Sequence, residues 1–147
     1  MRMIRGLLIA CLLPVVAACG VQNTWAPEEN VQRALWAEPG PAKLTLFTVE
    51  STSTGTGAHS ALMVSGSHRA LFDPAGSFRH PHAPERNDVL FGMTPTVLAV
   101  YVDYHARETF KVRIQEVEVP PEVAARALAL IQDHGAVPKA HCNVAVT

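Results

Sequence analysis

The feature that most constrains this chain is a series of short apolar runs that alternate with polar residues and end at glycine, proline or a polar loop. Successive side chains of a strand point to opposite faces, so this alternation is typical of strands. Because the runs are short and separated by turn residues, they predict a largely antiparallel sheet. The runs lie at residues 43–50, 59–65, 69–73, 88–93, 96–106 and 109–119.

Two other segments have the pattern of helices. In residues 121–135 a proline opens the segment, Glu122 lies in the first turn and Gly135 follows the last one. Residues 27–36 could form a second, shorter helix that begins at Pro27. The strands and helices together predict an α+β fold, with the sheet packed against one or two helices. The buried stripe expected on the longer helix consists of Val123, Ala127, Leu130 and Ile131.

The first eighteen residues have the layout of a secretory signal. Two arginines precede an apolar run that ends in small side chains before Cys19. The run is too short to span a bilayer, and we expect no membrane-spanning helix after it. The segment "VAAC" followed by Gly20 resembles the bacterial lipobox, which implies that Cys19 is acylated and becomes the first mature residue. Several acyl chains anchor a protein stably. An ordinary signal peptide, cut without acylation, is the alternative.

These signals divide the chain into three parts. Residues 1–18 are expected to be a lipoprotein signal peptide, residues 19–41 a tether with a short helix, and residues 42–147 the folded domain. By the same resemblance, Gly20 implies delivery to an outer membrane, with the domain facing the periplasm. Without the signal, ten Lys and Arg stand against thirteen Asp and Glu, a formal charge of −3. This weakly acidic balance gives no electrostatic basis for binding nucleic acid.

Cysteine usage raises a question about Cys142. Cys11 is removed with the signal and Cys19 is acylated, so Cys142 is left as a single thiol in an oxidising compartment. A disulfide framework is therefore not expected. Cys142 is either a nucleophile or a small, inert hydrophobic residue in the core.

A histidine and an aspartate are expected to meet in the hairpin of residues 59–76. If its turn is centred on Gly66, His59 lies directly opposite Asp73, with Cβ atoms about 4.5–5.5 Å apart. The carboxylate could then accept the Nδ1 proton of His59 and leave Nε2 for catalysis. As alternatives, His59 is a polar residue at a sheet edge, and Asp73 only starts a turn with Pro74.

The order of these residues is similar to that of a known family. "GAHSALMV", "RALFDPAG" and the cysteine segment "HCN" resemble the circularly permuted papain-like hydrolases, relatives of NlpC-type cell-wall peptidases and lecithin–retinol acyltransferases. The resemblance covers about residues 57 to 147. It implies a permuted papain-like fold and a catalytic set of Cys142 as nucleophile, His59 as base and Asp73 as orienting group. The implied reaction is hydrolysis or acyl transfer at an amide or ester of a peptidoglycan peptide or a lipid, without a cofactor.

One departure from the family leaves two functions open. The family has a long buried helix after the cysteine, whereas five residues follow Cys142 here. The expectation is either a chain that is cut short after Thr147 or a degenerate site. The alternative function is therefore a non-catalytic envelope lipoprotein that acts as a binding or structural module.

The remaining histidines are expected to play smaller roles. His80 and His82, completed by His68 or Glu85, are a weaker alternative as zinc ligands, and no metal is predicted. His105 and His134 are expected at the surface.

Overall fold

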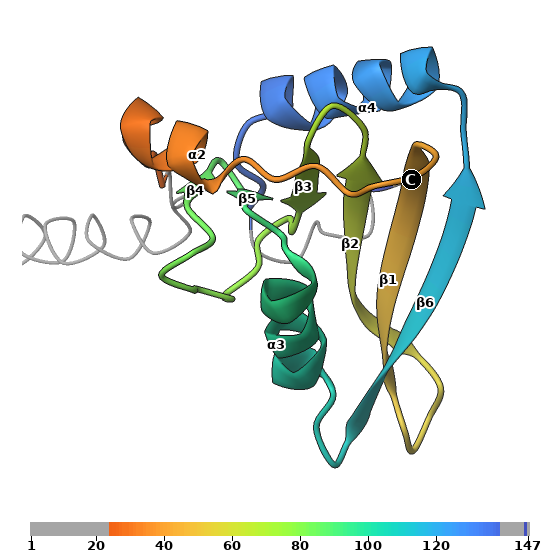
Figure 1. Cartoon of the computed structure of the whole chain (residues 1–147). Coiled ribbons are helices and arrows are strands. Elements are labelled where there is room, and N and C mark those ends of the chain that lie inside the picture. Colours follow the sequence, from red (N-terminus) through yellow and green to blue (C-terminus); the bar gives the residue numbers. More distant parts are fainter. Residues whose placement is uncertain (1–23, 139–145, 147) are drawn as a thin grey trace, which may run out of the picture.

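The structure, a computed structural model, describes residues 24–138 and 146 and has an antiparallel sheet at its centre (Figure 1). The six strands of this sheet follow the order β4-β5-β3-β2-β1-β6. They are β1 (Lys43–Ser51), β2 (Gly57–Ser65), β3 (Arg69–Phe72), β4 (Glu85–Arg86), β5 (Val89–Phe91) and β6 (Phe110–Glu118). The helices are α2 (Glu28–Ala34), α3 (Pro95–His105) and α4 (Pro121–Asp133). The predicted α+β class with a largely antiparallel sheet is confirmed.

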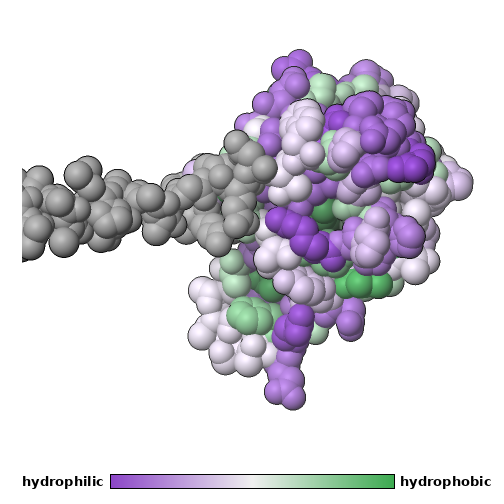
Figure 2. All heavy atoms as spheres, turned by 90° about the vertical axis from the view of Figure 1, so that its left-hand side faces the viewer, coloured by the Kyte–Doolittle hydropathy of each residue, from purple (hydrophilic) through white to green (hydrophobic). Residues whose placement is uncertain are grey.

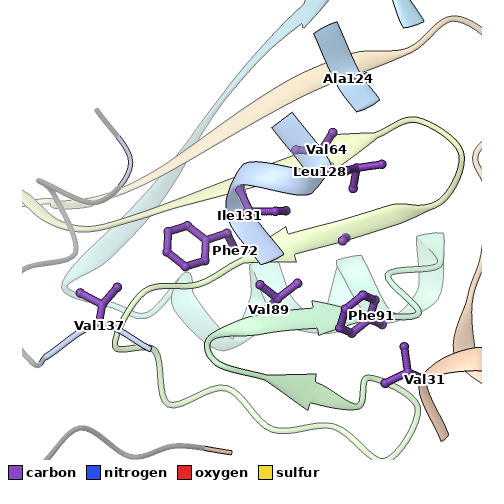
Figure 3. Close-up of a cluster of buried hydrophobic side chains, with 10 residues drawn as sticks. Val31, Val64, Phe72, Val89, Phe91, Ala124, Leu128, Ile131 and Val137 are labelled. Carbon is purple, nitrogen blue, oxygen red and sulfur yellow. The ribbon is translucent and has the colours of Figure 1, made fainter. Parts of the chain in front are cut away.

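Helix α4 covers one face of the sheet. Its buried residues join a cluster that includes Val64 of β2 and Phe72 of β3 (Figure 3). The buried positions of the helix recur at the spacing of one helical face. They are Ala124, Leu128 and Ile131.

The apolar stripe predicted for α4 was only partly right. Ile131 is buried and Ala127 is partly buried, but Val123 and Leu130 are 42% and 60% exposed. The helix is rotated about its axis relative to the predicted stripe. The small side chain of Ala124 allows a close approach to the sheet, and the tip of Leu128 lies within 3.2 Å of the position that a Cβ on Gly66 would occupy.

Helix α3 covers the opposite face, where the alternation of β2 directs Ala61 and Met63. Val97 and Tyr101, one helical turn apart, are buried against this face. In Figure 1, α3 lies in the lower half of the molecule and α4 along its top.

The strand expected at residues 96–106 was wrong, since this segment is α3. Thr94 caps the helix, because its side-chain oxygen accepts a hydrogen bond from the backbone N–H of Val97 at 3.3 Å. Pro95 follows at the first helical position, where its missing N–H costs nothing. These two residues are a start signal for a helix, and they outweigh the strand preference of the valines that follow.

Helix α2 confirms the short helix expected near residue 28. Its residue Val31 is only 4% exposed and belongs to the same cluster as Phe91 and Leu128. The folded domain therefore begins before residue 42, the boundary that the sequence indicated, and α2 is a part of its core.

The hairpin of β2 and β3 has a different register from the predicted one. Leu62 pairs with Phe72 and Ser65 with Arg69, so the turn is centred on Ser67. His59 therefore does not lie directly opposite Asp73; it pairs with Val49 of β1 on its other side. The difference amounts to two residues along the partner strand, and an even shift keeps every side chain on its predicted face.

The surface of the described residues is mixed in character. The side of the molecule on which α2 lies is mostly hydrophilic, with small hydrophobic patches between polar side chains (Figure 2). Within residues 24–138, no helix has the length and hydrophobicity needed to cross a membrane.

His68 should make the stability of the fold depend on pH. Burial lowers the pKa of His68 below its usual 6.5, and its Nε2 is buried with no hydrogen-bond partner among the described residues. Near this pH the folded protein therefore binds fewer protons at His68 than the unfolded chain does. The contribution of neutral His68 to the unfolding free energy is complete above pH 6.5. It decreases as the pH falls from 6.5 through the lower pKa of the folded state. Glu28 and Arg86 are the charged groups that line the same cavity.

We expect His68→Phe, which keeps a ring beside Phe91, to flatten the decrease in unfolding free energy between about pH 7.5 and 5.5. Urea unfolding at several pH values measures this slope, and the exposed His82→Gln should keep the wild-type slope. Equal slopes in the His68→Phe variant and the wild type would show that this imidazole does not couple folding to pH.

Candidate active site

The structure brings together two of the three residues predicted to be catalytic. His59 lies in β2 and Asp73 directly follows β3, and His59 Nε2 is 2.6 Å from Asp73 Oδ1. The side chain of His59 is 17% exposed and that of Asp73 is 3% exposed. A carboxylate that is this deeply buried needs hydrogen-bond donors to offset its lost hydration. The neighbouring strand supplies the imidazole as one of them.

The ring nitrogen that meets the carboxylate is not the expected one. The sequence predicted a bond from Nδ1, whereas the structure places Nε2 at Asp73. A carboxylate is an acceptor, so Nε2 carries the proton and donates it. In neutral His59 the nitrogen that can accept a proton is then Nδ1.

Tyr101 of α3 supplies the second donor to the buried carboxylate. Its hydroxyl donates to Asp73 Oδ1 at 2.9 Å. Burial, reinforced by the negative charge of Asp73, raises the pKa of Tyr101 far above its usual range, so the phenol stays protonated. The ring packs edge-on against Phe47 and Phe78, which fixes its direction.

His105, the last residue of α3, is part of the same cluster. Its ring is stacked on that of His59, with centroids 5.5 Å apart and planes inclined by 6°. Its Nδ1 lies 2.9 Å from the backbone oxygen of Tyr101, which can only accept, so Nδ1 carries the proton. Burial lowers the pKa of His105, which favours the neutral ring. His105 was expected at the surface, but the structure places it half-buried at the end of α3.

The loop after β3 holds Asp73 in place. The backbone N–H of Asp73 donates to the backbone oxygen of Asp88 at 2.8 Å. The side chain of Asp88 accepts from the backbone N–H groups of Ala75 at 2.9 Å and Val137 at 2.8 Å. The segment that leads toward Cys142 is thereby attached to the turn that carries Asp73.

Gly76 closes the turn against the carboxylate. Its backbone N–H donates to the backbone oxygen of Asp73 at 2.9 Å. A Cβ at this position would lie 1.8 Å from Asp73 Oδ2, so any larger residue would have to displace the side chain. The glycine is required here for space, since its backbone is not in the left-handed region.

The other predicted site residues are placed as follows. Cys142 and Cys19 lie outside the described residues. The rings of His80 and His82 are 5.6 Å apart, while Glu85 forms an ion pair with Arg79 at 2.8 Å. The weaker zinc alternative consisted of His80 and His82 with His68 or Glu85. Within residues 24–138, none of these four residues belongs to a group of three potential metal ligands that lie close together.

A cavity lies apart from His59 and His105. It has a volume of about 840 Å³ and is bordered by α2, by residues 80–84 and by the start of α3. Arg33, Trp36 and His82 are among its lining residues, and His59 and Asp73 are not. This cavity is therefore separate from the buried carboxylate.

The comparisons with known proteins found no match: no family model, no curated protein and no solved structure is similar to this chain. The resemblance to permuted papain-like hydrolases thus stays a prediction from the short motifs around His59, Asp73 and Cys142.

Gly76→Ala should disrupt the site and destabilise the fold. The new methyl group meets the Asp73 carboxylate, and forcing extra volume into a packed site costs about 1–3 kcal/mol. Gly57→Ala is a matched control, because a Cβ there would meet only Thr48, at 3.8 Å. Urea unfolding compares the two variants. If Gly76→Ala were no less stable than Gly57→Ala, the turn would not be packed against the carboxylate.

Proposed function

We propose that the protein is a lipid-anchored thiol hydrolase or acyltransferase of the bacterial cell envelope, with a permuted papain-like arrangement of its site. Cys142 is the nucleophile, His59 the general base and acid, and Asp73 the group that orients the imidazole. The observation that carries this proposal is the hydrogen bond from His59 Nε2 to the buried Asp73 carboxylate at 2.6 Å. An imidazole held by a carboxylate is the usual partner of an activated nucleophile.

The positions of the residues around Cys142 support its role. Val137 donates to Asp88, which also holds the turn after Asp73. Val146 packs against the same core cluster as Val137. Cys142 follows Val137 by five positions, and an extended chain of that length spans at most roughly 17 Å. Val137 and Val146, the described residues on either side of Cys142 in the sequence, thus both contact the folded domain, and Val137 shares its partner Asp88 with the turn after Asp73.

The chemistry follows from these roles. His59 Nδ1 takes the proton of the Cys142 thiol, and the thiolate attacks the carbonyl carbon of an amide or ester. The leaving amine or alcohol receives that proton from His59, and a thioester remains on the sulfur. His59 then deprotonates water, for hydrolysis, or another acceptor, for acyl transfer; the resulting nucleophile attacks the thioester carbonyl, the C–S bond breaks, and the released sulfur regains the proton from His59. Asp73 stabilises the imidazolium between these steps, and Tyr101 holds Asp73 by its hydroxyl.

The proposed envelope location would give access to two kinds of substrate. Acylation of Cys19 would tether the domain to the outer membrane on its periplasmic side, where peptidoglycan peptides and acyl lipids both occur. Both contain the amide or ester carbonyl that a thiolate attacks. The resemblance to cell-wall peptidases and to acyltransferases supports the same pair of substrate classes.

A non-catalytic binding lipoprotein is the second candidate function. The cavity of about 840 Å³ beside α2 favours it, because the cavity offers a volume suited to a small ligand and does not contain His59. In this case the His59–Asp73 pair would serve only to hold β2 against the turn after β3.

Alkylation of Cys142 by iodoacetamide separates the two functions. We expect the wild-type protein to react well below pH 8.5, the pKa of an ordinary thiol, because an adjacent imidazolium stabilises the thiolate. His59→Ala should shift the reaction toward higher pH, and Asp73→Asn should shift it less. Peptide mass spectrometry assigns the label to Cys142, and Cys142→Ser should remove it.

His82→Gln is the matched control, since this histidine is exposed and lies outside the cluster. It should keep the wild-type profile. A thiol that reacts with the same pH profile in His59→Ala as in the wild type, or only after unfolding, would exclude the catalytic role and favour the binding lipoprotein.

The lipid anchor has a separate test. Cys19→Ser should move the protein from the membrane fraction to the soluble periplasmic fraction and abolish its labelling by radioactive palmitate, because the acyl chains provide the attachment. Membrane association that persists in this variant would contradict anchoring through Cys19.

A further inference from the structure

His105, which has no role in the proposed catalysis, completes a group of three potential metal ligands with His59 and Asp73. His59, Asp73 and His105 each offer one ligand atom, and these atoms all lie within 4.8 Å of one another. They come from β2, from the turn after β3 and from the end of α3. In the part of the chain that the structure describes, this is the one group of three His, Cys, Asp or Glu residues whose ligand atoms lie this close together.

His105 makes the kind of hydrogen bond that metal-binding histidines commonly make with their second ring nitrogen. Its Nδ1–H donates to the backbone oxygen of Tyr101 at 2.9 Å, which leaves the lone pair on Nε2. Metal-bound histidines commonly donate their other ring N–H to a carbonyl or carboxylate in this manner.

The spacing of His59 and Asp73 requires a small adjustment. Ligand atoms on a tetrahedral zinc ion, each about 2.0–2.1 Å from the metal, lie about 3.3 Å apart. His59 Nε2 and Asp73 Oδ1 are 2.6 Å apart, so they would separate by less than 1 Å. Neutral His59 would also bind zinc through Nε2 as the tautomer that carries its proton on Nδ1. Tyr101 would continue to hold the carboxylate.

We propose that His59, Asp73 and His105 form a zinc-binding site, and that zinc bound there inhibits the thiol chemistry by occupying His59. Two imidazoles and one carboxylate suit zinc and neighbouring transition metals better than calcium or magnesium. Three protein ligands leave a fourth position open. The inhibition rests on the proposed function, whereas zinc binding itself does not.

The first experiment measures zinc binding alone. Isothermal titration of the full-length protein with zinc chloride, after treatment with a chelator, should give one site per chain. His105→Phe, which keeps a ring stacked on His59, should weaken the affinity roughly 100-fold because a ligand is lost. Thermal unfolding without metal verifies that this variant is folded. Cys142→Ser should bind zinc within about tenfold of the wild type, so failure of the catalytic proposal would not remove this result.

The controls address the other histidines. His82→Gln should bind zinc as the wild type does, although the rings of His80 and His82 lie 5.6 Å apart. Equal affinity in His105→Phe and the wild type, or a loss of binding in His82→Gln, would overturn the site.

Saturating zinc should slow the alkylation of Cys142 in the wild type but not in His105→Phe. Zinc that binds at this site without slowing alkylation would overturn the inhibition alone.

Discussion

The buried carboxylate of Asp73 is the constraint on which the rest of the site depends. An ionised group that is removed from water is costly unless donors replace its hydration. His59 from β2 and Tyr101 from α3 supply these donors, so one side chain connects the sheet to the helix that covers it. Gly76 leaves the space that the carboxylate occupies, and Asp88 fixes the turn around it. The orientation of the imidazole follows from this arrangement.

The same arrangement would give His59 two roles, one in the proposed thiol chemistry and one in the proposed zinc site, and these roles would exclude each other. With a proton on Nε2 the ring is held by Asp73, and Nδ1 can exchange protons with a nucleophile. With zinc on Nε2 the ring becomes a ligand beside His105, and the proton exchange stops. A site of this kind would respond to the zinc concentration of its compartment without a separate regulatory domain. The closeness of one ligand atom each from His59, Asp73 and His105, all within 4.8 Å of one another, is the structural basis of this connection.

The sequence predicted those strands and helices whose formation depends mainly on nearby residues. The alternation in residues 110–118 and the start and stop residues of α4 were sufficient for a strand and a helix. Helix α3 was missed because residues 97–102 are mostly β-branched or aromatic, and the cap at Thr94 was given no weight. The role of His105 depends on that helix and on tertiary packing, so a strand assignment concealed it. The meeting of histidine and aspartate was predicted despite the wrong register, because an even shift preserves the face.

The most direct test of the account is a nitrogen-15 NMR spectrum of the ring of His59, recorded at neutral pH before and after Cys142 is alkylated. We expect a proton on Nε2, hydrogen-bonded to Asp73, and a resonance of Nδ1 that moves when the Cys142 sulfur is modified. A proton on Nδ1 instead, or an Nδ1 resonance that does not change on alkylation, would contradict the pairing of this imidazole with the thiol.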